Sequence, residues 1–197
     1  MSAPRGAVVA VHGRTQDPEF IRGVVDRLAI GSSLTVIAPA AEGRSWYPKP
    51  FLAPMEENQP FLDAALDRVD ACVEEALAAG VPLERIVLLG FSQGACLLTH
   101  SALTRPRRYA AVIAFTGGFI GPIGTSIPRP AGLEGMPFAF ATHTDDPWVP
   151  LSRTLESIAV AGSAGASARL LVEPGGVHEV TDAAIRLADE VLAPLFP

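Results

Sequence analysis

The stretch that decides the fold runs Arg85-Ile86-Val87-Leu88-Leu89-Gly90-Phe91-Ser92-Gln93-Gly94-Ala95. Its first half is a short apolar run typical of a strand that is buried on both faces, and a helix-compatible segment follows to Leu103. The Gly-x-Ser-x-Gly pattern between them is the strand, turn and helix context that presents a serine hydroxyl as a nucleophile. A plain small-residue turn would require the glycines but not the serine. Because a serine hydroxyl is a weak nucleophile, Ser92 must be accompanied by a base, an acid and oxyanion donors if it is catalytic.

Similar apolar runs recur along the chain, and helical patterns separate most of them. An alternation of strands and helices predicts an α/β protein with a mainly parallel sheet and helices on both faces. With 197 residues, of which 49% are hydrophobic, the chain is expected to form a single domain, residues 1–197. The predicted strands are residues 7–11, 34–38, 86–89, 111–115, 138–141 and 169–172.

Three helices are predicted from their end signals and apolar stripes. Asp17 is expected to cap a helix that has Pro18 at its first position. A longer helix is expected from Pro60 to the glycine at Gly80, and the last helix follows His178.

Charge and cysteine content exclude several classes of protein. The chain has 15 Lys and Arg against 21 Asp and Glu, a net charge of −6, so nucleic acid is not expected as a partner. Cys72 and Cys96 lie in apolar helical stretches without metal-ligand spacing, so neither a metal site nor a disulfide is expected. Apolar runs are too short for a signal-peptide core or a membrane span. We therefore expect a cytoplasmic protein without integral membrane association.

A serine hydrolase on such a sheet supplies its acid and then its histidine after later strands. Two aspartates, Asp145 and Asp146, follow the predicted strand 138–141. Asp146 precedes Pro147 and a second turn that would fix its side chain, so we favour it as the acid and Asp145 as a solvated turn residue.

Four histidines compete for the role of the base. His178 lies just beyond the predicted strand 169–172, between a glycine pair and a helix, and is the preferred base. His12 is expected to be a buried ring that braces its loop, and His100 lies within a helix. His143 precedes the aspartates and is expected beside the site.

The two oxyanion donors are expected to be backbone N–H groups. In this architecture one comes from the residue after the nucleophile, here Gln93, and one from the loop after an early strand, here Arg14. The Arg14 side chain either pairs with an acid to hold the loop or contacts an anionic substrate.

Two long loops rich in Gly and Pro, residues 39–60 and 121–137, are expected near the rim of the active site. The first carries Trp46 and Tyr47, which we expect to form the substrate pocket together with Trp148. An aromatic cluster of Trp46, Tyr47 and Phe51 that only pins the loop to the domain is the alternative. Exposed aromatic residues are equally compatible with a homodimer contact.

Four segments together resemble the phospholipase/carboxylesterase family of α/β-hydrolases, which includes bacterial carboxylesterases and acyl-protein thioesterases. They are Val11-His12-Gly13, the tract from Leu83 to Ala95, the turn from Asp146 to Pro150, and Gly176-Val177-His178. The resemblance implies a compact α/β-hydrolase fold, a Ser92, Asp146 and His178 triad, oxyanion donors at Arg14 and Gln93, and no cofactor. It also implies that the tryptophan of Ser45-Trp46-Tyr47 borders an acyl pocket.

The chain departs from the family pattern at two positions. Thr15 stands where the family usually has a glycine two residues after His-Gly, and His143 replaces a common glycine. The first departure puts the backbone path of the Arg14 loop in question.

We therefore expect a serine-dependent carboxylic ester hydrolase that acts through an acyl-enzyme on a small or medium acyl ester. An acyl thioesterase and a lysophospholipase are alternatives, because the same machinery attacks each carbonyl. A fold that binds a small molecule without turning it over would not need all three triad residues in order. Dienelactone hydrolysis is the weaker enzymatic alternative, because that group typically uses a cysteine nucleophile.

Overall fold

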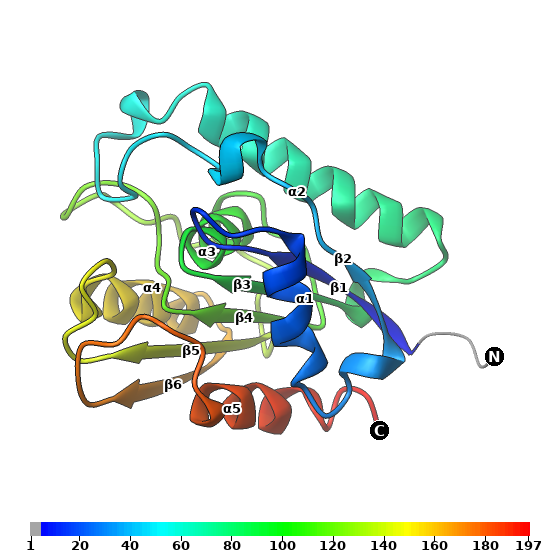
Figure 1. The fold of residues 1–197 in the computed structure, drawn as a ribbon. Helices are drawn as coiled ribbons and strands as arrows, with labels where there is room; N and C mark the ends of the chain where they lie inside the picture. The colour runs from blue at the N-terminus through cyan, green and yellow to red at the C-terminus, as the bar shows by residue number, and fades with distance from the viewer. Residues whose placement is uncertain (1–4) are drawn as a thin grey trace.

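Six parallel strands form one sheet in the order β2-β1-β3-β4-β5-β6, in a computed structural model that describes residues 5–197. Every neighbouring pair is parallel, so all six carboxyl ends lie at one edge of the sheet, on the left in Figure 1. The predicted α/β class is confirmed. The strands are β1 Gly6–Val11, β2 Leu34–Ile37, β3 Ile86–Phe91, β4 Ala111–Phe115, β5 Pro137–His143 and β6 Ser167–Glu173.

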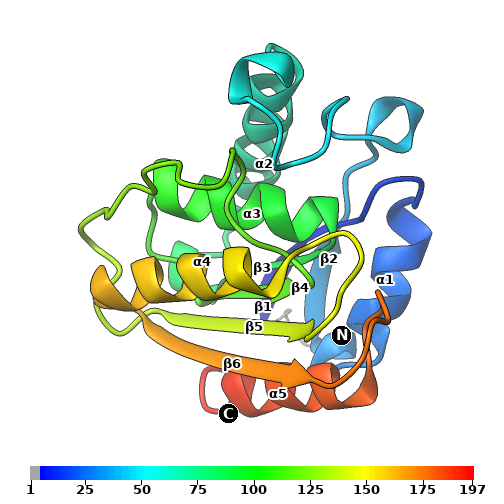
Figure 2. The same ribbon diagram turned by 90° about the vertical axis from the view of Figure 1, so that its left-hand side faces the viewer.

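The two faces of the sheet are each covered by helices, as the continuous apolar strands require. Alternate residues of β1 supply the two cores, with Val9 in the core on one face and Val8 in the core on the other. Figure 2 shows α2 (Phe61–Ala78), α3 (Gln93–Thr104) and α4 (Leu151–Ser163) on one side of the sheet. The other side is covered by α1 (Pro18–Asp26) and α5 (Asp182–Leu192).

The helix ends follow the signals in the sequence. Asp17 caps α1, where its carboxylate accepts a hydrogen bond of 3.1 Å from the Phe20 N–H. Helix α2 begins at Phe61, directly after Pro60, and the chain leaves it through Gly80 at φ +86°. These ends agree with the predicted helices to within two residues.

Helix α4 was not among the helices predicted from the sequence. Its buried residues are Arg153, Thr154, Ser157 and Ala161, so polar side chains occupy the stripe that would otherwise be apolar. The fully buried Arg153 donates hydrogen bonds to the carbonyl oxygens of Gly121 and Pro122. These hydrogen bonds offset part of the cost of burying a polar helix face, which apolar periodicity alone would not identify.

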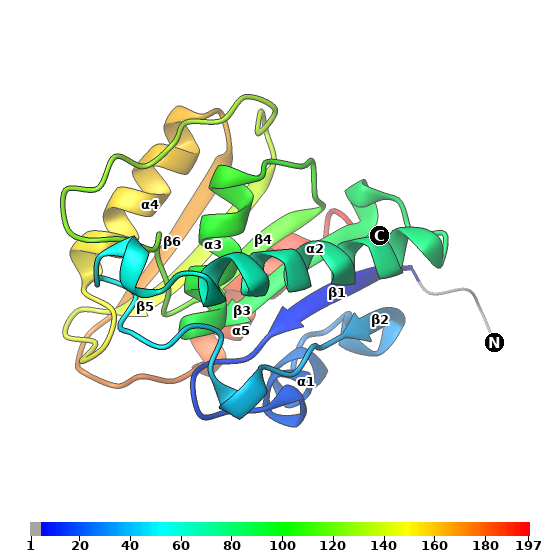
Figure 3. The ribbon, with the colours of Figure 1, turned by 90° about the horizontal axis from the view of Figure 1, so that it is seen from above.

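Only the start of the loop 121–137 lies near the site rim. Gly121 donates its N–H to the Phe51 carbonyl oxygen, 2.8 Å away, but the loop must then connect the carboxyl end of β4 to the amino end of β5. Because parallel strands require a crossover, the chain passes beside α4 to the opposite edge, as Figure 3 shows from above. The loop 39–60 instead stays at the carboxyl edge.

Candidate active site

Ser92 lies in a sharp turn between the end of β3 and the start of α3. Its backbone has φ +53° and ψ −120°, a conformation that non-glycine residues rarely adopt. The flanking glycines are required by close approach. A Cβ at Gly94 would lie 2.1 Å from the Val11 carbonyl oxygen, and one at Gly90 would lie 2.7 Å from the backbone of α3. The turn therefore packs directly against β1 and presents Ser92 at the carboxyl edge of the sheet.

A continuous chain of hydrogen bonds joins Ser92, His178 and Asp146. The His178 Nε2 lies 2.8 Å from the Ser92 Oγ, and its Nδ1 lies 2.7 Å from the Asp146 Oδ2. These residues follow β3, β6 and β5, and the parallel sheet brings the three strand ends to one edge.

Asp146 is held as a carboxylate acceptor. The N–H groups of Trp148 and Val149 both donate to its Oδ1 at 2.9 Å. Burial raises the pKa of this carboxyl, but the hydrogen bonds from His178, Val149 and Trp148 outweigh burial and bring the pKa below its usual value. Asp145 is exposed and accepts a hydrogen bond from the Thr144 hydroxyl, so Asp146 is the aspartate that meets His178.

The other three histidines lie outside the cavity beside Ser92. His12 accepts from the Ala41 N–H at Nε2, and burial lowers its pKa, so the neutral ring braces its loop. His100 stacks on Phe119 at 4.4 Å between ring centroids. His143 is buried at the end of β5, with its Nε2 3.8 Å from the Glu173 carboxylate.

The backbone N–H groups of Arg14 and Gln93 donate to no acceptor within residues 5–197. Gln93 is the first residue of α3, where a helix N–H has no intrahelical partner and the helix dipole favours negative charge. Thr15 adopts φ +66°, so the backbone takes the left-handed conformation that glycine would favour, in spite of the substitution.

The Arg14 side chain pairs with no acid in the described part of the chain. Its guanidinium instead donates to the carbonyl oxygens of Tyr47, Pro48 and Lys49. The arginine therefore holds the loop 39–60 through backbone carbonyl groups and not through an acid.

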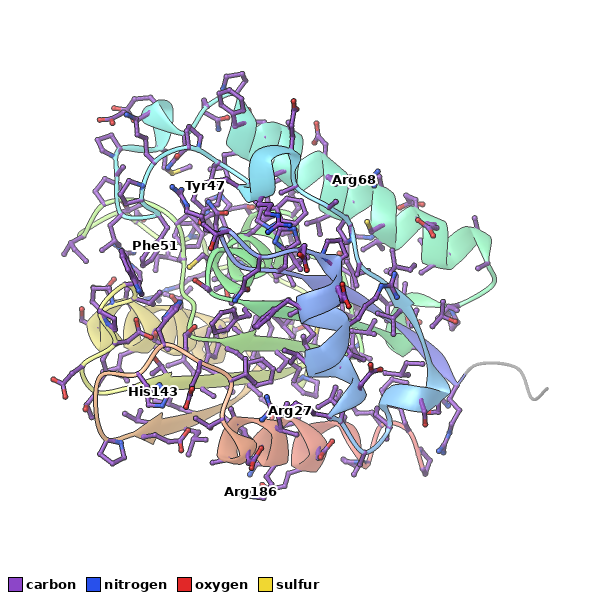
Figure 4. The ribbon with its side chains drawn as sticks, viewed as in Figure 1. Arg27, Tyr47, Phe51, Arg68, His143 and Arg186 are labelled. Atoms are coloured by element: carbon purple, nitrogen blue, oxygen red, sulfur yellow. The ribbon has the colours of Figure 1, made fainter. Side chains whose placement is uncertain are left out.

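A cavity of about 410 Å³ opens beside Ser92 and His178. Tyr47 lines it from the loop 39–60 and Trp148 lines it from the turn after β5, with 71% of the tryptophan exposed. Figure 4 shows Tyr47 and Phe51 between this loop and the strand ends. Gln16, Pro50, Phe91 and Cys96 also line the cavity and were not predicted to do so. The serine motif could have indicated Phe91, which directly precedes Ser92, and Cys96, which lies one helical turn after it.

The structure places Trp46 outside that cavity. Its indole Nε1 donates to the His12 carbonyl oxygen at 2.8 Å, and the ring lines a separate depression that also contains Phe61 and Arg68. Trp46 thus pins the loop 39–60 to the loop after β1, which is the alternative that the sequence left open.

Burial raises the pKa of the Cys96 thiol to about 12, so the thiol is neutral at physiological pH. Residues 5–197 contain no group of three His, Cys, Asp or Glu side chains arranged to hold a metal ion. None of the helices in this part of the chain is long and apolar enough to cross a membrane.

The parallel sheet, the serine turn after β3, and the acid and histidine after later strands define an α/β-hydrolase fold. Residues 29–192 match the sequence profile described as Phospholipase/Carboxylesterase. The chain belongs to this family of hydrolases.

Known relatives agree with this assignment. A phospholipase/carboxylesterase from Dyadobacter fermentans has 37% identity and a TM-score of 0.88, and the comparison covers 95% of this chain and 90% of that one. Acyl-protein thioesterase 1 of Schizosaccharomyces pombe is 28% identical over 54% of this chain and 48% of its own. An acyl-protein thioesterase 1 homologue of Dictyostelium discoideum is 34% identical over 46% of this chain and 40% of its own. The matched regions thus span about half or less of these two curated relatives.

Proposed function

We propose that this protein is a serine-dependent carboxylic ester hydrolase that works through an acyl-enzyme and needs no cofactor. The observation that carries the proposal is the hydrogen-bond chain from the Ser92 Oγ through His178 to Asp146. Nucleophile, base and orienting acid in this order are the parts that acyl transfer requires.

In the first half of the reaction, the Ser92 Oγ attacks the acyl carbonyl carbon while the His178 Nε2 takes its proton. Negative charge moves to the carbonyl oxygen, where the N–H groups of Arg14 and Gln93 stabilise it. The tetrahedral intermediate then collapses, the bond to the alcohol oxygen breaks, and His178 returns the proton to that alcohol. Water repeats the sequence on the acyl-enzyme, which releases the carboxylic acid and restores Ser92.

Asp146 fixes the imidazole in one tautomer. Its Oδ2 accepts the Nδ1 proton of His178, so Nε2 carries the lone pair that faces Ser92. Its second oxygen is occupied by two backbone donors, which keeps the carboxylate ionised and stabilises the imidazolium that forms during the reaction.

The cavity supports an acyl group of small or medium size as the substrate. Its lining is mainly apolar, and a volume of about 410 Å³ lies at the lower end of the range for small-molecule sites. An acyl thioester is the second candidate, because the relatives in Schizosaccharomyces pombe and Dictyostelium discoideum are named acyl-protein thioesterases.

The test is a panel of p-nitrophenyl esters of graded acyl length, matched thioesters and a lysophospholipid, measured on wild type and Ser92→Ala. We expect wild type to turn over esters and Ser92→Ala to lose at least about 10⁴-fold in kcat. The Ser163→Ala variant, which removes an exposed hydroxyl on α4, is the matched control and should keep wild-type activity.

Labelling by a fluorophosphonate tests the nucleophile directly. Wild type and Ser163→Ala should be labelled, and Ser92→Ala should not. Undiminished labelling of Ser92→Ala would refute the assignment, and ligand binding by the wild type without any turnover would favour a non-catalytic protein.

A further inference from the structure

The side chain of Arg14 binds three successive backbone carbonyl groups of the loop 39–60. Its Nη2 donates to the Tyr47 oxygen at 2.7 Å and to the Lys49 oxygen at 2.9 Å, and its Nη1 donates to the Pro48 oxygen at 3.0 Å. A guanidinium presents its donors in a rigid planar fork, which suits a row of carbonyl oxygens. Arg14 therefore fixes the path of this segment as well as its own position.

The side chain of Gln93 binds the same segment. Its Oε1 accepts the Trp46 N–H at 2.9 Å, and its Nε2 donates to the Tyr47 oxygen at 2.9 Å and to the Ser45 Oγ at 3.3 Å. The residue is only 6% exposed, so these bonds are shielded from water. Both residues that supply the proposed oxyanion donors thus attach to one short segment through their side chains.

Two further bonds tie this segment to the loop after β1. The Thr15 N–H donates to the Arg44 oxygen at 2.8 Å, and the Trp46 Nε1 donates to the His12 oxygen at 2.8 Å. We call residues 44–49 the oxyanion strap. It links the loop that carries Arg14 to the start of α3, which carries Gln93.

We propose that Arg14 is a positioning residue whose guanidinium, through the oxyanion strap, sets the direction of its own backbone N–H relative to that of Gln93. This inference rests on the proposed function. Oxyanion donors must lie about 2.7–3.1 Å from the developing charge, and a misplacement of about 1 Å can cost about 100-fold in rate.

The loop after β1 needs such an external constraint. Thr15 has φ +66°, and a left-handed conformation costs a non-glycine residue about 1–2 kcal/mol. Without the arginine, the strap would retain the bonds from Thr15, Trp46 and Gln93 but would lose the three bonds that the guanidinium makes. The loop would then be free to relax away from the geometry that catalysis requires.

The same strap reaches the substrate cavity. Tyr47 belongs to it, and Pro50 and Phe51 follow it directly; all three line the cavity beside Ser92. Figure 4 shows Tyr47 and Phe51 on this stretch. The oxyanion strap therefore supports two parts of the site. One is the cavity wall beside the acyl group, and the other is the pair of N–H donors for the acyl oxygen.

The experiment replaces the Arg14 side chain and leaves its backbone N–H in place. Arg14→Met removes all donors, Arg14→Gln retains a short donor, and Arg14→Lys retains the charge without the planar fork. We expect kcat on a p-nitrophenyl ester to fall about 10- to 100-fold in Arg14→Met, with KM within about threefold of wild type. The affinity for an alkyl trifluoromethyl ketone, which mimics the tetrahedral intermediate, should fall by the same factor as kcat/KM.

Two controls separate positioning from charge and from general stability. Arg108→Lys removes a similar arginine bond, to the Glu134 oxygen at 2.9 Å and away from the cavity, and should keep wild-type kcat. Methylguanidine should restore part of the activity of a truncated Arg14→Ala variant and leave Arg108→Lys unchanged. Thermal unfolding identifies which variants are folded. If Arg14→Met does not fold, the activities of Arg14→Lys and Arg14→Gln test the positioning role.

Full activity in Arg14→Lys would mean that charge alone matters, and would overturn the proposal. Folded Arg14→Met or Arg14→Gln with kcat/KM within twofold of wild type would also overturn it. If wild type hydrolyses esters and Ser92→Ala does not, such a result rejects only the role of Arg14. An inactive wild type, or fluorophosphonate labelling of Ser92→Ala, rejects the proposed function itself.

Discussion

The two sides of the Ser92 site are built in opposite ways. On the proposed triad side, His178 and Asp146 bring side chains to the reaction; two backbone N–H groups hold Asp146, and Asp146 in turn holds His178. On the proposed oxyanion side, the backbone N–H groups of Arg14 and Gln93 are the groups assigned to the reaction, and their side chains bind the loop 39–60. A residue type therefore predicts its role only where the side chain itself does the chemistry.

The supports of the two sides differ as well. The loops that carry Asp146 and His178 are extensions of paired strands, and the pairing continues beyond the sheet where Thr144 N–H donates to the Glu173 oxygen and Asp145 N–H to the Gly175 oxygen. The oxyanion side has no strand pairing at its rim. Side-chain bonds between residues about 33 to 48 positions apart in the sequence hold it instead, together with the single backbone bond from Thr15 to Arg44.

Asp146→Asn tests the triad side, and we expect the largest effect in this comparison. An amide can donate a hydrogen bond to the imidazole and thus favour the wrong tautomer, so kcat should fall about 10³- to 10⁴-fold, by analogy with the corresponding substitution in serine proteases. Steady-state kinetics on a p-nitrophenyl ester measures the change. Asp145→Asn, at the exposed neighbour, is the matched control and should stay within about twofold of wild type. Comparable losses in the two variants would contradict the assignment of Asp146.

Gln93→Met tests the oxyanion side, with a smaller expected effect. The variant leaves the Trp46 N–H without its buried acceptor, at a cost of about 1–3 kcal/mol, and loosens the strap at its second anchor. We expect kcat to fall about 10- to 100-fold, with unfolding in urea reporting the loss of stability.

A double-mutant cycle sharpens this result. If Arg14 and Gln93 act through one strap, the loss in Arg14→Lys/Gln93→Met should be smaller than the sum of the two single losses in transition-state free energy. Additive losses would mean that the two side chains support their backbone donors independently.

The same contrast explains what the sequence could and could not predict. Ser92, Asp146 and His178 each follow a recognisable strand, so the parallel sheet alone predicts that they share an edge. The pinned position of Trp46 depends on a hydrogen bond to the His12 carbonyl oxygen after β1, and the bonds of Arg14 go to carbonyl oxygens of the irregular, proline-rich loop 39–60. Backbone carbonyls are present at every residue, so no pattern of side chains indicates which of them are used.

The His100→Leu variant should have the smallest effect on activity. It tests whether α3, the helix behind Ser92, only supports the site. Burial and, to a smaller extent, nearby Arg105 lower the pKa of His100 to about 4 from an ordinary value of 6.5, against opposing contributions from the Ile120 backbone and Asp63. Between pH 4 and 6.5, the His100 imidazole is therefore protonated in the unfolded chain and neutral in the folded chain. The free energy of unfolding falls as the pH drops through this range, by up to about 3 kcal/mol. In His100→Leu, urea unfolding at pH 6.5 and 4.5 should show less of this loss than wild type, while kcat/KM at neutral pH stays within about twofold. An unchanged pH dependence of unfolding would show that His100 is protonated in the folded protein, and a large loss of activity would mean that α3 does more than support the oxyanion side.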